Sequence, residues 1–195
     1  MSAALVSEVP GWFGKLPGLG DFASRRLPER FVRRWDRWLQ AGLARASEDP
    51  DWLARYLVAP IRRFWLAPGV VDAAGWAGLL MPSVDRVGRH FPLTLARPLE
   101  PLAGALAARA WYRALDAAAR RVLDMDYTVD DFEQALAALE GPPVEAADAA
   151  ANGLAAGLHG GTVWWCDEAE PGARFACYAQ LPPAAALAAM LGAAP

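Results

Sequence analysis

The amino-acid sequence predicts an α/β domain, a three-layer αβα sandwich with helices on both faces of one mixed β-sheet. Three observations support this prediction. Strand-like apolar runs alternate with amphipathic helical segments, which is typical of layered domains. The run 76–81 is almost entirely apolar, as expected for a central strand covered on both faces. Two short aromatic runs, 163–166 and 174–178, predict a C-terminal hairpin, which argues against a purely parallel sheet.

Length and composition predict a single domain spanning residues 1–195. Hydrophobic residues make up 55% of the chain and charged residues 21%, which excludes a disordered protein. We divide the domain into a loose N-terminus (1–10), a first half (11–96), and a segment (97–195) that comprises helices, the hairpin and a last helix.

The first half is expected to contain strands and two helices. Phe31, Trp35 and Leu39 recur at helical spacing after Pro28, a residue that suits the first turn of a helix. The expected elements, in order, are a strand at 11–15, a helix from Pro28, a short helix capped by Asp49 or Asp51 and ending by Leu57, and strands at 63–66, 76–81 and 91–96.

The second half is expected to be mainly helical before the hairpin. An alanine-rich stretch predicts one helix from Pro101 to Leu123. Thr128 and Asp131 resemble a capping box, which predicts a helix that ends before Gly141. Residues 144–161 stay ambiguous because alanines favour a helix and glycines weaken it. A final helix is expected from 182 to 191.

The segment 83–90 places polar and charged side chains directly after the predicted central strand. Ser83 could cap a single helical turn through Val87, leaving Arg86 and Arg89 on similar sides. Free backbone N–H groups and two guanidinium groups could bind a phosphate or a partner's carboxylate. The alternative is a structural network in which Asp85 pairs with one arginine. Both interpretations stay open.

A second polar segment, 14–21, forms an irregular glycine-rich loop. It lacks the phosphate-binding pattern, because its lysine precedes the glycines that it would need to follow. Lys15, Asp21 and Arg25 could line a surface groove together with Arg86 or Arg89. The alternative is that Asp21 caps the local turn and that Lys15 is solvated.

Trp38 lies beside the apolar stripe of the first helix, close to Trp35. An edge of Trp38 left in solvent would suit a protein interface. The alternative, which we favour, is that both indoles pack in the core.

No residue set in the sequence predicts catalysis. Ser83, Asp85 and His90 are too close in sequence to be expected to form a triad, and no Gly-x-Ser-x-Gly elbow surrounds the serine. Cys166 and Cys177 are the only cysteines, too few for a usual structural zinc site. We therefore expect no catalytic residues, no metal and no cofactor.

Charge and hydropathy limit the expected partners and location. The net charge of −3 argues against nucleic acid as the main partner. The N-terminus does not resemble a signal peptide, and charged residues or prolines interrupt every long apolar run. We expect a cytoplasmic protein that does not insert into membranes.

Several sequence blocks in the first half resemble the TagF (ImpM) family of bacterial type VI secretion-associated proteins. The resemblance runs in order from about Gly11 to Leu95. The blocks are Gly14-Lys15-Leu16-Pro17-Gly18-Leu19-Gly20-Asp21-Phe22, Leu27-Pro28-Glu29-Arg30-Phe31, Trp35-Asp36-Arg37-Trp38-Leu39-Gln40-Ala41-Gly42-Leu43, Tyr56-Leu57-Val58-Ala59-Pro60, Arg63-Phe64-Trp65-Leu66-Ala67-Pro68-Gly69 and Met81 to Thr94.

The resemblance implies a non-enzymatic, post-translational repressor of type VI secretion assembly. Its implied partner is a cytoplasmic forkhead-associated scaffold in a kinase and phosphatase pathway, with the pathway phosphatase as a second partner. The residues within the matching blocks, or directly beside them, that could contact a partner are Lys15, Asp21, Arg25, Trp38, Ser83, Asp85, Arg86 and Arg89. The alternative function is a small-molecule or phosphate-sensing domain that binds an anion between loops 14–25 and 83–90.

Overall fold

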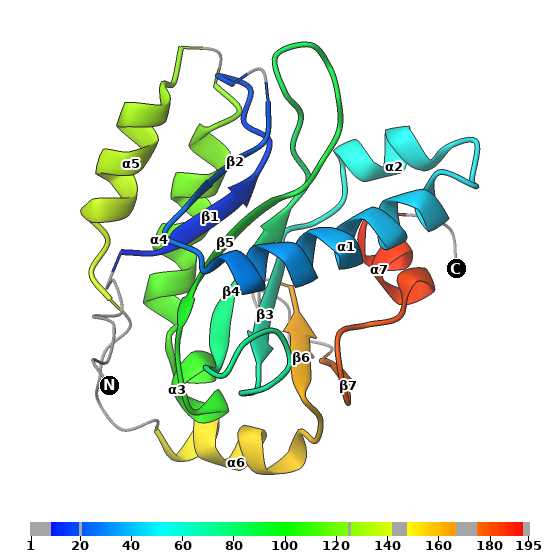
Figure 1. Ribbon diagram of the computed structural model, residues 1–195. Helices are drawn as coiled ribbons and strands as arrows, with labels where there is room; N and C mark the ends of the chain where they lie inside the picture. The colour runs from blue at the N-terminus through cyan, green and yellow to red at the C-terminus, as the bar shows by residue number, and fades with distance from the viewer. Residues whose placement is uncertain (1–8, 20, 125, 142–147, 167–174, 193–195) are drawn as a thin grey trace.

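The computed structural model describes residues 9–19, 21–124, 126–141, 148–166 and 175–192 (Figure 1). Seven strands form one sheet in the order β2-β1-β5-β4-β3-β6-β7, and every neighbouring pair is antiparallel. The strands are β1 (Gly11–Gly14), β2 (Ala23–Arg25), β3 (Arg62–Leu66), β4 (Trp76–Met81), β5 (Leu93–Pro98), β6 (Thr162–Trp165) and β7 (Ala176–Tyr178).

The prediction of a mixed sheet was therefore wrong, whereas the α/β content is confirmed. Parallel neighbours need a long crossover connection, usually a helix. Here β3, β4 and β5 follow one another along the chain and pair in that order, without a helix between them. The helices are inserted between β2 and β3, between β5 and β6, and after β7 instead.

The helices contribute to two separate hydrophobic clusters. Side chains alternate across a strand, so Phe64 belongs to one cluster and the adjacent Trp65 to the other. The first cluster includes residues of α1 and α7, and the second includes residues of α3 to α6. The helices are α1 (Glu29–Ala46), α2 (Trp52–Leu57), α3 (Leu102–Ala107), α4 (Arg109–Arg121), α5 (Val129–Ala137), α6 (Ala149–Gly157) and α7 (Ala184–Met190).

Several local predictions are confirmed. All six residues of β4 are buried between two neighbouring strands. The C-terminal hairpin forms, with Val163 opposite Cys177, although its acidic connection at 167–174 lies outside the described residues. The capping box at the start of α5 is present, because Thr128 and Asp131 exchange side-chain and backbone hydrogen bonds. Within the ambiguous stretch, residues 149–157 form α6.

Other local predictions were wrong. The helix expected from Pro101 to Leu123 divides into α3 and α4 at Ala108, whose ψ of 37° is not helical. The sequence analysis missed β2. The helical turn expected from Ser83 to Val87 is instead the tip of the β4–β5 hairpin, where an isolated bridge joins Val84 to His90.

Close helix packing fixes α7 against α1. Gly42 of α1 faces Leu187 of α7 so closely that an added Cβ would lie 2.3 Å from Leu187 Cδ2. Only a glycine permits this approach without a shift of the Leu187 side chain or of the helices. Among the described residues, no helix is both long enough and apolar enough to cross a membrane.

Candidate interaction surface

Two hairpin loops lie side by side at one end of the sheet (Figure 1). They are the β1–β2 loop and the β4–β5 loop. Because β1 and β5 are antiparallel neighbours, with Phe13 opposite Thr94, the end of β1 adjoins the start of β5. The Arg86 backbone N–H also points to the Leu19 carbonyl, with an N···O distance of 3.5 Å. The sheet topology thus brings together two polar segments that are about seventy residues apart.

A buried ion pair joins these loops. Lys15 Nζ lies 2.9 Å from Asp85 Oδ2, and the two side chains are 5% and 0% exposed. The Ser83 hydroxyl donates a hydrogen bond to the Lys15 carbonyl, 2.8 Å away. The interpretation of Lys15 as a solvated lysine was therefore wrong, because the neighbouring hairpin covers it. Ser83 links the loops and does not cap a helical turn.

Asp85 accepts hydrogen bonds from several donors at once. Besides Lys15, these are the backbone N–H groups of Val87 and Arg89, at 3.0 and 2.9 Å, and Arg89 Nε at 2.6 Å. Burial by itself would raise the pKa of Asp85. The hydrogen bonds from Lys15 and Arg89, with that from the Val87 N–H, outweigh burial and hold this pKa well below its usual range. Asp85 is thus an anion that fixes the conformation of its own loop.

Helix α2 supports the loop from the other side. The buried Tyr56 hydroxyl accepts a hydrogen bond from the Ser83 N–H and donates one to the Ser83 carbonyl, both at 2.9 Å. Burial raises the pKa of Tyr56, so the phenol stays neutral. His90 packs edge-on against Tyr56 and Trp52, with ring centroids 5.9 and 6.2 Å apart. Since Ser83 and Asp85 bond to other groups, the described contacts include no Ser–His–Asp relay.

The outer side of the two loops combines charged and apolar groups. Val87 is 71% exposed at the hairpin tip, between the exposed Arg86 and the partly exposed Arg89. Gly88 follows with a φ of +84°, which closes the turn at a conformation that glycine adopts readily. Phe22 is 47% exposed and packs edge-on against the Phe91 ring at 4.7 Å. We call Phe22, Arg86, Val87 and Arg89 the loop surface.

The sequence analysis missed Phe22 and Val87 as surface residues. The available signal was an apolar residue beside a charged one at a loop tip: Phe22 follows Asp21, and Val87 follows Arg86. The sequence does not show whether such an apolar residue is buried or exposed, because that depends on which strands pair. Lys15 Nζ lies 4.8 Å from the Phe22 ring centroid, so the ion pair also supports this aromatic group from below.

The remaining predicted site residues lie beside this surface, apart from it or inside the protein. Asp21 lies beside it: it is exposed, and its side chain accepts a hydrogen bond from the adjacent Phe22 N–H at 2.8 Å. Arg25 lies apart: it is exposed at the end of β2, opposite Trp12 and three residues beyond Phe22. The favoured interpretation, that Trp35 and Trp38 both pack in the core, is confirmed, and Trp38 as an exposed anchor was wrong. It is 9% exposed, and its Nε1 donates to the Pro182 carbonyl at 2.7 Å, because the segment leading into α7 covers it.

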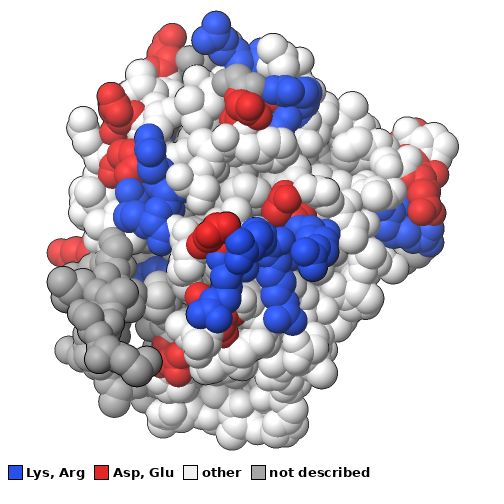
Figure 2. Space-filling model, in the orientation of Figure 1, with Lys and Arg blue, Asp and Glu red and all other residues white. Residues whose placement is uncertain are grey.

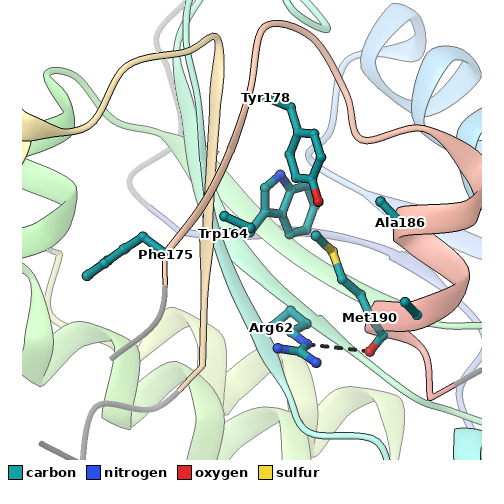
Figure 3. Close-up of a pocket in the computed structure, with 8 residues that line it drawn as sticks. Arg62, Trp164, Phe175, Tyr178, Ala186 and Met190 are labelled. Carbon is teal, nitrogen blue, oxygen red and sulfur yellow. Dashed lines mark hydrogen bonds between the residues drawn. The ribbon is translucent and has the colours of Figure 1, made fainter. Parts of the chain in front are cut away.

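A separate hollow of about 400 Å³ lies between the β6–β7 hairpin and α7 (Figure 3). Arg62 enters it beside three aromatic side chains, Trp164, Phe175 and Tyr178. The guanidinium group is already engaged there, because Nη1 contacts Cys166 Sγ at 2.8 Å and Nε contacts the Met190 carbonyl at 3.4 Å. Arg62 therefore links the hairpin to the last helix. Among the described residues, no three His, Cys, Asp or Glu side chains gather as a metal site.

With this geometry defined, comparison with known proteins identifies the family. The model of the TagF N-terminal domain, described as type VI secretion system-associated, matches residues 11–139. The chain belongs to the TagF family. No curated protein matches it.

A solved structure is similar over nearly the whole chain. It is the crystal structure of PA0076 from Pseudomonas aeruginosa PAO1 at 2.05 Å resolution. The sequences are 36% identical, the alignment covers 93% of each chain, and the TM-score is 0.78. This coverage is more than residues 1–139 could provide, so the likeness continues into the part that contains α6, the hairpin and α7. The family model itself extends the relationship from residues 11–95, on which the sequence analysis based it, to residue 139.

Proposed function

We propose that this chain is a non-enzymatic regulator that represses type VI secretion assembly through protein–protein contacts. Its partner in this proposal is the cytoplasmic forkhead-associated scaffold of the kinase and phosphatase pathway. Family membership supports the link to type VI secretion. We further propose that the helices on both sheet faces make a three-layer scaffold, which supports the loops rigidly.

The buried Lys15–Asp85 ion pair is the observation that carries this proposal. A buried ion pair contributes little net stability unless its geometry and hydrogen bonding are good. Here Asp85 has donors on both carboxylate oxygens, and they fix the backbone of the turn. Arg86 and Val87 are consequently presented to solvent on an ordered support. A preorganised mixture of arginine and apolar groups suits a protein interface.

The alternative, an anion-sensing site between the loops, receives less support. Its central cation would be Lys15, whose ammonium group is already bonded to Asp85 and is 5% exposed at the side chain. A thermal-shift screen with phosphate and nucleotides addresses this alternative. A ligand at 100 times its Kd would add about 2.7 kcal/mol of stability.

Binding to the purified scaffold tests the proposal directly. Arg86→Ala combined with Val87→Asp changes only exposed side chains, so the protein should fold normally. We expect the affinity to fall roughly tenfold, as for a central arginine and its apolar neighbour in an interface. Arg113→Ala on α4 controls for the loss of one exposed arginine, because it lies outside the two loops that form the loop surface.

The same variants can be compared in the native host. Excess wild-type protein should reduce effector secretion. Excess Arg86→Ala/Val87→Asp variant should leave secretion at its normal level. Undiminished scaffold binding by the folded double variant would exclude the loop surface. Failure of the wild-type protein both to bind the scaffold and to reduce secretion would contradict the proposed function itself.

A further inference from the structure

The outer side of α1 carries a group of arginines that is separate from the loop surface. They are spaced by one, three or four residues, so they lie on one side of the helix, and all of them are exposed. We call this group the arginine stripe: Arg30, Arg33, Arg34 and Arg37. Figure 2 shows basic side chains gathered at the centre of the face on which Figure 1 displays α1.

The stripe is a local excess of positive charge on a chain whose net charge is −3. Within residues 30–37, Asp36 is the single acidic residue, and it accepts a hydrogen bond from Gln40. Arg34 contacts a neutral group, the Gln180 amide oxygen, at 3.3 Å. Arg37 forms no hydrogen bond or ion pair with the part of the chain that the structure describes. Two cations of the stripe, Arg34 and Arg37, thus have no acidic partner among the described residues.

The other two arginines have carboxylate neighbours, one mostly buried and one in solvent. Arg30 Nε lies 3.0 Å from Asp72 Oδ1, and these side chains are 65% and 11% exposed. Arg33 pairs with Glu29, and these side chains are 64% and 82% exposed. An exposed pair such as Arg33–Glu29 is weak and exchanges readily. A carboxylate from another molecule could therefore replace Glu29 at Arg33, and could approach Arg30 from its exposed side.

Folding does not account for these four arginines. Arg30 with Arg34, and Arg33 with Arg37, are like charges four residues apart, which slightly destabilises a helix. The buried face of α1 is formed by other residues, including Phe31, so the four guanidinium groups are not part of the core. The concentration of positive charge is therefore better explained by an interaction of this helix face with another molecule.

We propose that the arginine stripe is a docking surface for an acidic segment of a partner protein, rich in aspartate and glutamate. A guanidinium group binds a carboxylate through two parallel hydrogen bonds, a geometry that lysine cannot provide. From Arg30 to Arg37 the helix rises about 10 Å, which suits a short segment. Nucleic acid or an anionic bilayer would extend past the stripe and meet the exposed Glu29 and a net negative protein. This surface goes beyond the proposed function and does not depend on it.

Fluorescence anisotropy with a labelled oligoglutamate peptide tests the proposal on the full chain. We expect saturable binding at low salt that weakens as salt is added. Arg33→Gln combined with Arg37→Gln should weaken binding roughly threefold to tenfold, because two exposed charge contacts are lost. The matched control is Arg113→Gln with Arg120→Gln, which removes the same charge from the exposed face of α4 and should leave binding unchanged within about twofold.

Three outcomes would overturn the proposal. One is no saturable binding of the peptide. Another is equal weakening by both double variants, which would mean that only net charge matters. The third is tighter, stripe-dependent binding to phosphatidylglycerol vesicles or to a phosphoserine peptide of equal charge, which would assign the surface to a membrane or to phosphorylated partners. None of these results bears on scaffold binding by the loop surface, so failure here is distinguishable from failure of the proposed function.

Discussion

Removal of one hydroxyl group should show how strongly α2 supports the loop surface. Tyr56 is fully buried, and its hydroxyl satisfies both the N–H and the carbonyl of Ser83. In Tyr56→Phe, the carbonyl keeps a second donor, the Phe91 N–H at 3.1 Å. The Ser83 N–H has no such replacement, so it becomes a buried donor without an acceptor.

The expected loss in the free energy of unfolding follows from the unpaired Ser83 N–H. A buried hydrogen-bond donor left without a partner costs about 1–3 kcal/mol. For a chain of 195 residues, each kcal/mol lowers the Tm by about 2–4 °C. The ring itself stays in place, so loss of packing adds little. Hydrogen exchange should also become faster in residues 83–90, because the loop loses its attachment to α2.

Tyr127→Phe is the matched control. It removes the same hydroxyl group from a partly buried tyrosine, whose hydroxyl donates a solvent-exposed hydrogen bond to the Asp131 carbonyl at 3.2 Å. Water can replace that contact, so the free energy of unfolding should change by less than about 0.5 kcal/mol. Both variants can be compared by urea denaturation. If Tyr56→Phe is as stable as Tyr127→Phe and exchange at 83–90 is unaltered, the loop does not depend on α2.

Three further perturbations follow from the structure. Hydrogen bonding lowers the pKa of Asp85 in the folded protein, so its contribution to stability is present above the unfolded pKa of about 3.9 and is lost as the pH falls towards the lower folded value. NMR titration should find this carboxyl group still ionised at a pH where an exposed aspartate is half protonated, and an ordinary midpoint would contradict the network. Gly42→Ala should destabilise the protein, because overpacking against Leu187 costs about 1–3 kcal/mol. This cost outweighs the gain of about 1 kcal/mol in helix propensity. A raised Tm would show that Leu187 or α7 adjusts to the added methyl group without loss of stability. Thr128→Ala should cost about 0.5–2 kcal/mol in denaturant unfolding, since it removes the cap whose hydroxyl accepts from the Asp131 N–H, and no change would mean that the end of α5 is frayed.

Elements governed by local patterns were predictable. The apolar run of β4, the helical spacing in α1 and the capping box of α5 depend on residues close together in the chain. Patterns of this kind report which face of an element is buried and where the element begins. They do not report which strand becomes a neighbour, and the mixed sheet was therefore a wrong inference from correct elements.

The division between α3 and α4 shows a different limit. The sequence there is rich in alanine, which favours a helix on both sides of Ala108. The helix is nevertheless interrupted, and Ala108 is buried against the core beside Ala105 and Leu106. Tertiary packing overrides a local preference of this size, because helix propensities differ by less than about 1 kcal/mol among ordinary residues.

The sequence by itself determined that this chain folds into a domain with α/β content, that two polar loops interrupt its apolar segments, and that it resembles the TagF family. The tertiary structure alone decided which side chains of those loops meet and which of them are buried. Lys15 and Asp85 are about seventy residues apart, and only the antiparallel pairing of β1 with β5 brings them within 2.9 Å. The same pairing buries Lys15, Ser83 and Asp85, which were candidates for partner contact, and leaves Phe22 and Val87 in solvent. Side-chain periodicity is a local property, whereas burial at a loop depends on which distant segment lies beside it.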